Sequence, residues 1–294
     1  MQSAISVTEL EDIAGQYLAA LDQSEGGLLS LDGKILRGTL APGETQGLHL
    51  LALQHATENR VVEQTALKQK ENEISAAKRL LKKAKIAGHI VSGDAIFAQR
   101  ELSRQVVQRG GDYLWKVKEN QKKLLQQIAS GVQTEAGASA TVDCARSLEK
   151  GHGRIEERTL FASSRCADQL DWPFVSQVFV LQSDRFECRS QRRSLTTHYG
   201  ITSLPPMEAD AERLLALTRG HWGIENGLHY RRDVTFKEDA CRMKWRPAAE
   251  ALAVCTNLAV GLIRHAGWEN VAEARRYYDA HPEEALRLIM ASPP

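Results

Sequence analysis

Two short apolar segments, each leading into an aspartate, constrain the fold of this chain more than any other feature. Leu28–Leu31 runs into Asp32 and then a glycine, and His89–Ser92 runs into a glycine and then Asp94. We interpret each segment as a short buried strand that stops at a turn. Helical periodicity separates the two strands, and this order predicts an α/β fold. Because open α/β sheets place their chemistry at strand ends, the two aspartates are the first candidates for a functional site.

The neighbouring segments complete the predicted sheet. Residues 48–56 and 60–67 predict a β-hairpin, and Asn72 is expected to cap the helix that follows. Residues 112–117 alternate as another strand. Residues 125–205 change in character, because helical periodicity fades after Ile128, and they predict a β-rich region with short strands at 155–162, 174–182 and 197–203.

Helices are predicted at both ends of the chain. In the first, the face expected to enter the core consists of Leu10, Ile13, Tyr17 and Leu21. Pro247 suits the first turn of a later helix, whose expected core face consists of Leu252, Cys255, Leu258 and Leu262. Two short helices are expected at 269–279 and 282–291.

Composition and motifs exclude several classes of protein. The five cysteines form no CxxC pair, which argues against a disulfide scaffold and a structural zinc site. The chain has no apolar stretch of membrane-spanning length and no secretory signal, so we expect a cytoplasmic protein. The motifs GxxxxGK[ST], GxSxG and HExxH are also absent from the sequence, so P-loop, serine-hydrolase and zinc-hydrolase chemistry are not indicated.

Binding to nucleic acid would depend on local charge, because 38 Lys and Arg residues are balanced by 37 Asp and Glu residues. Residues 68–85, 185–193 and 231–246 are locally basic and could neutralise phosphates. Trp115 and Trp245 could stack on a base or fill the core. The alternative for the basic segments is an ordinary solvated surface.

Asp32, Asp94 and Glu225 form a candidate set of metal-binding carboxylates. Phosphoryl transfer by two divalent cations needs oxygen ligands, and two aspartates at neighbouring strand ends with a glutamate on a helix would supply them. The alternative is that both aspartates are ordinary turn residues, as Asp-Gly and Gly-Asp often are.

Glu225 belongs to a segment with a helical pattern, residues 219–239. His221, Glu225, Leu228 and Arg232 share one face of this segment. A carboxylate at the edge of a core face usually has a charged partner or a metal. The alternative is a solvated face with ordinary ion pairs such as Glu225–Arg232.

Several segments, in this order, resemble bacterial insertion-sequence transposases of the DDE class. More narrowly, they look like the branch that includes the H-repeat-associated proteins of Rhs elements. The resemblance extends from about residue 28 to about residue 265. It is carried by LDGKILRG, QKENEISAAKRLL, HIVSGDAIFAQRELSRQVVQRGGDYLWKVKENQ, HGRIEERTL and RGHWGIENGLHYRRDVTFKEDACRM.

This resemblance implies an RNase H-like catalytic core, with flanking helices on a mixed sheet that a β-rich insertion interrupts. Asp32, Asp94 and Glu225 match the catalytic triad of the family. In the family these carboxylates hold two divalent ions, so two Mg²⁺ or Mn²⁺ ions are the expected cofactors.

The same resemblance implies DNA contacts near the triad, made by Lys118, Asn120, His221 and Arg232. His221 stands one helical turn before Glu225, where related transposases often have Arg. Arg232 stands where the family tends to have an apolar residue, which is a departure from the pattern.

Four segments are expected along the chain. They are a short N-terminal helical segment (1–27), the first part of the core (28–127), the β-rich insertion (128–206) and the last part of the core with the catalytic helix and C-terminal helices (207–294). Family members usually carry an additional N-terminal helical region, which is expected to be largely missing here.

The predicted function is that of a DNA transposase, which cuts at the ends of its element and joins the freed 3′-hydroxyl to target DNA. Its expected partners are element ends and target DNA, on which it forms a homodimer, and it is expected at the bacterial nucleoid, away from membranes. One alternative is a truncated, catalytically silent remnant that at most binds DNA. Another is a metal-dependent nuclease that does not join strands.

Overall fold

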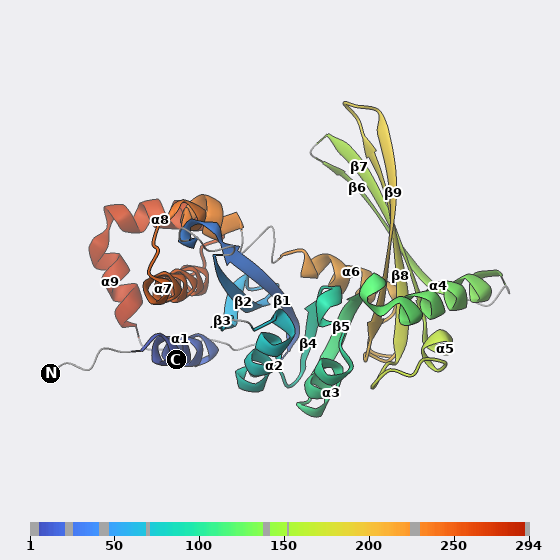
Figure 1. Cartoon of the computed structure of the whole chain (residues 1–294). Coiled ribbons are helices and arrows are strands. Elements are labelled where there is room, and N and C mark those ends of the chain that lie inside the picture. Colours follow the sequence, from blue (N-terminus) through green and yellow to red (C-terminus); the bar gives the residue numbers. More distant parts are fainter. Residues whose placement is uncertain are drawn as a thin grey trace. The chain divides into compact units, whose positions relative to one another are not determined.

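The computed structural model describes residues 6–20, 26–40, 47–68, 71–137, 142–151, 153–223 and 230–291 (Figure 1). Its contacts divide the chain into two compact units. The first unit combines Met1–Lys85 with Trp222–Pro294, and the second is Ile86–His221. Each unit contains strands and helices, so the α/β class predicted from the sequence is confirmed.

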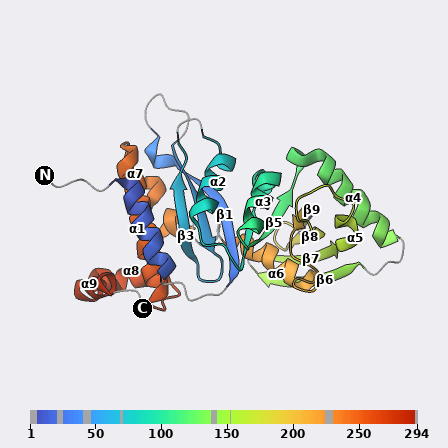
Figure 2. The same cartoon turned by 90° about the horizontal axis from the view of Figure 1, so that it is seen from below.

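The first unit is built on an antiparallel sheet of β1 (Gly27–Leu36), β2 (Leu48–His55) and β3 (Arg60–Ala66). Helix α1 packs against α7 and β3, and α2 contacts β2 and β3 (Figure 2). The helices of this unit are α1 (Val7–Ala20), α2 (Glu73–Lys83), α7 (Arg246–His265), α8 (Val271–Ala280) and α9 (Pro282–Met290), with short turns η1 (Arg37–Thr39), η5 (Arg231–Thr235) and η6 (Glu238–Ala240).

The second unit has a mixed sheet in the order β4-β5-β9-β8-β7-β6. Strands β4 and β5 are parallel and joined through α3, and all the other pairs are antiparallel. Its strands are β4 (His89–Gly93), β5 (Asp112–Val117), β6 (Asp143–Gly151), β7 (Arg154–Ser163), β8 (Gln177–Glu187) and β9 (Arg192–Thr202). Its helices are α3 (Arg100–Gln108), α4 (Lys122–Gly137), α5 (Ser164–Ala167) and α6 (Ala211–His221), with the turns η2 (Ala95–Phe97) and η3 (Glu119–Gln121).

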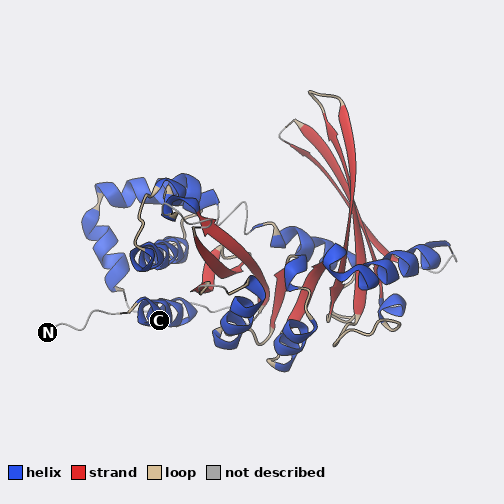
Figure 3. Cartoon of the chain, in the orientation of Figure 1, coloured by secondary structure: helices blue, strands red, loops and turns tan. Residues whose placement is uncertain are grey.

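The predicted hairpin and the Asn72 cap are confirmed, and the strands expected within residues 125–205 are present. The prediction that helical structure fades after Ile128 is wrong, because α4 continues to Gly137. Asn72 accepts a hydrogen bond from the backbone N–H of Ser75, and β7, β8 and β9 correspond to the expected strands. Strand β6 was not predicted, because almost all of its side chains are exposed and its sequence lacks the alternation of a half-buried strand. Figure 3 shows the far ends of β6 to β9 extending beyond the helices of their unit.

The prediction that a strand stops at Asp32 is wrong. Strand β1 continues to Leu36, and Asp32 is paired with Ala52 within the ladder. A Cβ on Gly33 would meet His49 Nε2 at 2.7 Å and Glu73 Oε1 at 2.9 Å, so a larger residue there would displace the ends of these two side chains. The glycine that suggested a turn therefore lies inside a strand, beside two closely approaching side chains.

Both predicted helix faces are partly wrong. In α1 Ile13 is 57% exposed, while Ala14 and Leu18 are buried. In α7 Leu252 is 41% exposed and Cys255 is also exposed, while the small residues Ala249, Ala253 and Gly261 are buried. A Cβ on Gly261 would meet Leu18 at 2.4 Å, so the two helices pack closely through small side chains. A pattern built from large apolar residues alone misses such an interface.

Among the described residues, one helix is long and apolar enough by composition to cross a membrane, and it is α7. Half of its apolar window is buried inside the unit, against α1 and the sheet. This burial is typical of the core helix of a globular unit.

Three carboxylates meet where α1 packs on β3 and α7. Glu11 of α1 is 8% exposed, and its Oε1 has no hydrogen-bond partner in the described structure. Burial, with the nearby charges of Glu250 and Glu63, raises the pKa of Glu11 to about 8. Burial also raises the pKa of Glu63 to about 7. The packing of α1 therefore favours protonated carboxyls.

Stability is expected to fall as the pH rises from about 5 to about 8. The pKa of Glu11 is about 8 in the folded state, against 4.5 for an ordinary carboxyl, so between these pH values the folded state binds more protons than the unfolded state. The full contribution of Glu11 to the free energy of unfolding is therefore present only below about pH 4.5, and it is lost as the pH rises to about 8. Glu11→Gln should raise the free energy of unfolding at pH 8.5 by about 2 kcal/mol and leave it nearly unchanged at pH 4.5. Urea unfolding at both pH values measures this, and Glu283→Gln on α9 should leave the pH difference unaltered.

Candidate functional site

Asp94 directly follows β4, at the end where β4 lies parallel to β5. Gly93 is paired with Trp115 in this ladder, and a Cβ on Gly93 would meet the Trp115 ring at 2.8 Å and Phe97 at 2.9 Å. The glycine lets the buried indole pack against the strand end. The sequence Gly93-Asp94 thus holds a carboxylate immediately beyond a tightly packed core, as predicted for this aspartate.

Two cationic or polar side chains approach the same oxygen of Asp94. Lys116 Nζ of β5 donates a hydrogen bond to Oδ1 at 2.8 Å, and His221 Nε2 of α6 lies 3.6 Å from that oxygen. The other ring nitrogen of His221, Nδ1, lies 3.0 Å from Ser92 Oγ of β4. His221 is buried, so its ring is fixed between Ser92 and Asp94.

The charge of this carboxyl follows from its neighbours. The close approach of His221 and the hydrogen bond from Lys116 hold the pKa of Asp94 well below its ordinary range, against the opposing effect of burial. The second carboxylate oxygen, Oδ2, has no partner among the described residues, and the side chain is 40% exposed. Asp94 therefore presents one engaged oxygen and one available oxygen, in an ionised state.

The other predicted DNA contacts of the second unit lie beside Asp94. Lys118 is exposed just after β5, with no ion-pair partner in the described part of the chain. Asn120 Nδ2 donates to the carbonyl of Ala95 at 2.7 Å, which ties η3 to the turn that follows Asp94. His221 faces the carboxylate from a buried position, so a direct contact with DNA remains a prediction for it.

The convergence of the three predicted carboxylates remains a prediction. Asp32 belongs to the first unit, where it is half-buried and accepts a hydrogen bond from the Gly33 N–H at 2.9 Å. Asp94 belongs to the second unit, and Glu225 lies outside the described residues. Within the described residues, the structure contains no cluster of three or more His, Cys, Asp or Glu side chains that could hold a metal.

Arg232 is fully buried in the first unit. Its Nε donates to Glu238 Oε2 at 2.5 Å, and its Nη1 donates to Gln64 Oε1 at 3.2 Å. Asn257 Nδ2 of α7 donates to the same Gln64 oxygen at 2.6 Å. These hydrogen bonds of the Arg232 guanidinium thus join β3, η5, η6 and α7. For Arg232 to contact DNA, the buried ion pair between Arg232 and Glu238 would have to open.

The sequence analysis missed Lys116 and His198. Lys116 is a charged residue inside the mostly buried strand Asp112–Val117. That position was the sequence signal by which Lys116 could have been identified as a site residue. His198 of β9 is half-buried, and burial followed by the charges of Lys116 and Lys118 lowers its pKa. The pairing of β5 with β9 brings His198 to this end of the sheet, which local periodicity could not reveal.

The two tryptophans proposed for base stacking differ. Trp115 is fully buried, stacks on Tyr113 and donates to Ser103 Oγ at 3.1 Å, so it belongs to the core. Trp245 is 70% exposed before α7. In the basic segment around α2, Lys83 forms an ion pair with Asp12.

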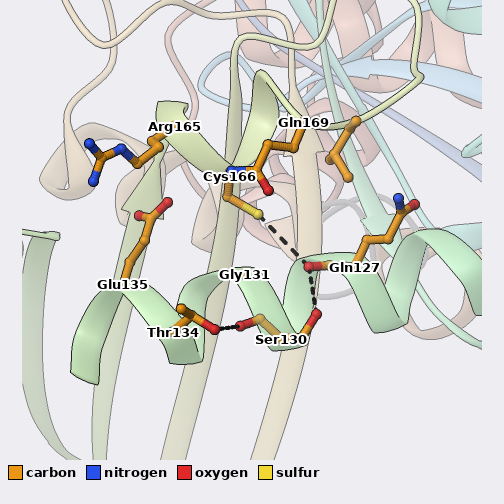
Figure 4. Close-up of a pocket in the computed structure, with 9 residues that line it drawn as sticks. Gln127, Ser130, Gly131, Thr134, Glu135, Arg165, Cys166 and Gln169 are labelled. Atoms are coloured by element: carbon orange, nitrogen blue, oxygen red, sulfur yellow. Dashed lines mark hydrogen bonds between the residues drawn. The ribbon is translucent and has the colours of Figure 1, made fainter. Parts of the chain in front are cut away.

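A separate hollow of about 480 Å³ lies between α4 and α5 (Figure 4). It is lined by polar side chains of both helices, among them Gln127, Glu135 and Arg165. Cys166 of α5 also lines it, and burial and then Glu135 raise the pKa of this thiol to about 11. A thiol that stays protonated at neutral pH is a packing group, not a nucleophile.

The family model described as "Transposase DDE domain" matches residues 23–262. Two Escherichia coli K12 proteins, "Putative protein YbfL" and "H repeat-associated putative transposase YhhI", are each 29% identical over 244 residues, which is 80% of this chain and 64% of each relative. The chain thus spans less than two thirds of the length of these relatives.

A solved synaptic complex of piggyBac transposase with hairpin DNA is similar at a TM-score of 0.48 and 11% identity, covering 88% of this chain and 52% of that one. The resemblance noted from the sequence is confirmed by the family model and by the H-repeat-associated relative.

Proposed function

Because the chain belongs to the family of transposase DDE domains, we propose that it is an insertion-sequence transposase that cleaves DNA and transfers the cut strand. The observation that carries this proposal is the state of Asp94. It is an ionised carboxylate at a strand end, with Oδ2 available and Oδ1 fixed by two neighbours. Such a group is suited to bind a hard divalent cation.

We propose that Asp32, Asp94 and Glu225 form the metal-binding triad. The donor set fits the ions that the family implies, because Mg²⁺ and Mn²⁺ prefer carboxylate oxygens and Mg²⁺ retains several waters. Bound divalent ions would supply an activated water or hydroxyl nucleophile and relief of charge on the phosphate. This part of the proposal rests on the donor chemistry and on the match to the family.

The chain's own residues have separable tasks around Asp94. Lys116 fixes the orientation of the carboxylate by its hydrogen bond to Oδ1, and His221, held by Ser92, acts with Lys116 to keep the carboxylate ionised. Asn120 fixes the turn after Asp94 through the Ala95 carbonyl. Lys118 is exposed just after β5 and would contact a DNA phosphate.

We propose element-end and target DNA as the partners, with a homodimer on DNA and a location at the bacterial nucleoid. The four-segment organisation given above, with an RNase H-like core interrupted at 128–206, belongs to the same proposal. It is supported by the chain order of antiparallel β1, β2 and β3 followed by the parallel pair β4 and β5, and by the later strands β6 to β9.

The test is metal-dependent cleavage of supercoiled plasmid DNA by the full chain, with Mn²⁺, Mg²⁺ or EDTA present, followed by an assay for joining of the cut ends. Nicking that requires the metal, together with strand joining, supports the proposal. Nicking without joining favours a metal-dependent nuclease. DNA binding without any metal-dependent nicking favours the catalytically silent remnant and overturns the proposed activity.

A further inference from the structure

The ion pair between Lys116 and Asp94 occupies a position where a divalent cation is expected. Lys116 Nζ lies 2.8 Å from Asp94 Oδ1, and the lysine side chain is only 17% exposed. Lys116 is on β5 and Asp94 directly follows the neighbouring parallel strand β4, so the two backbones hold this pair together. A half-buried ammonium is therefore built into the site as the counter-ion of this carboxylate.

We propose that Lys116 is a counter-ion that competes with the divalent metal for Asp94 and moves to a DNA phosphate when metal and DNA bind together. This inference rests on the proposed function. Two cations on one carboxylate repel each other, so metal binding weakens the lysine's hold on Oδ1. A strongly hydrated ammonium on a flexible stem can then turn to another anion, and a DNA phosphate offers one.

The arrangement of the site favours this exchange. His221 is held by Ser92 and remains beside Oδ1 after Lys116 has moved, so the carboxylate keeps one fixed neighbour. Oδ2 is available to a cation before the lysine leaves. Lys118 provides a second, exposed cation near the same strand end, which would help to place the phosphate.

Thermodynamic linkage gives the exchange a measurable consequence. If DNA draws Lys116 away from Asp94, then DNA tightens metal binding, and metal tightens DNA binding by the same factor. Without Lys116 the metal meets no competitor, and the part of this coupling that the lysine carries is lost. A residue that served the fold alone would not change the coupling in this way.

The experiment is a calorimetric titration of the full chain with Mn²⁺, with and without a 30-base-pair duplex of arbitrary sequence. For Lys116→Met without DNA we expect about 5- to 20-fold tighter Mn²⁺ binding than for the unaltered chain. Adding the duplex should tighten Mn²⁺ binding by several-fold in the unaltered chain and have little effect in Lys116→Met. Lys116→Arg, which keeps the cation, should resemble the unaltered chain.

The matched control is Lys122→Met, which removes the same charge from the start of α4, where the lysine is exposed. It should bind Mn²⁺ as the unaltered chain does. Equal or weaker Mn²⁺ binding by a folded Lys116→Met variant overturns the counter-ion role, and an undiminished effect of DNA in that variant overturns the exchange. A different result would be that neither the unaltered chain nor any variant binds Mn²⁺ at millimolar concentration. That result would overturn the metal site of the proposed function as well as the counter-ion role.

Discussion

Asp94→Asn is expected to reduce metal-dependent DNA cleavage by about 10³-fold, since the loss of a carboxylate ligand removes several kcal/mol of charge stabilisation. The amide keeps the shape of the side chain but supplies no negative charge to a cation. Asp94 makes no side-chain hydrogen bond to the turn that it begins, and it is 40% exposed, so the fold should survive the change. Plasmid nicking and Mn²⁺ titration on the same preparation measure the effect.

The matched control for this variant is Asp168→Asn, which changes an exposed aspartate at the end of α5 in the same unit. It should nick plasmid DNA as the unaltered chain does and show the same melting temperature. If Asp94→Asn retains more than a tenth of the cleavage activity, Asp94 is not a metal ligand of the reaction. The alternative considered from the sequence, an ordinary turn residue, would then explain it better.

The sequence allowed Asp94 to be identified more securely than its surroundings. A short apolar run that ends in Gly-Asp is a local signal, and the structure has the strand and the aspartate where that signal places them. The neighbours of the carboxylate come from distant segments, since Lys116 is on β5 and His221 is on α6. Local patterns placed His221 on one helix face with Glu225 but contain no information about its contact with Asp94.

The errors in the fold have a common physical origin. Asp32-Gly33 was interpreted as a turn because glycine favours turns, whereas here the glycine accommodates His49 and Glu73 beside a continuous strand. The α1–α7 interface was misplaced because it is made with Ala and Gly, whose burial a search for large apolar side chains does not detect. In both cases the decisive quantity is the space around a residue, which depends on tertiary packing.

Arg232→Met is expected to lower the free energy of unfolding by about 3–5 kcal/mol, because it leaves the buried Glu238 carboxylate without its partner. The same change removes a donor from Gln64 Oε1. Urea unfolding of the single variants and of the double variant Arg232→Met/Glu238→Gln measures the coupling of the pair. The double variant should recover part of the loss, since it buries no unpaired charge.

Arg287→Met is the control, because it breaks an ion pair of similar length on α9, Arg287–Glu284, whose side chains are 73% and 40% exposed. An exposed pair of this kind contributes about 0.2–1 kcal/mol, so this variant should unfold almost as the unaltered chain does. The contrast also tests the DNA contact predicted for Arg232. If Arg232→Met loses little stability but much DNA affinity, the arginine leaves its buried pair to bind DNA. If it loses much stability while its folded fraction binds DNA as before, the arginine serves to join β3, η5, η6 and α7.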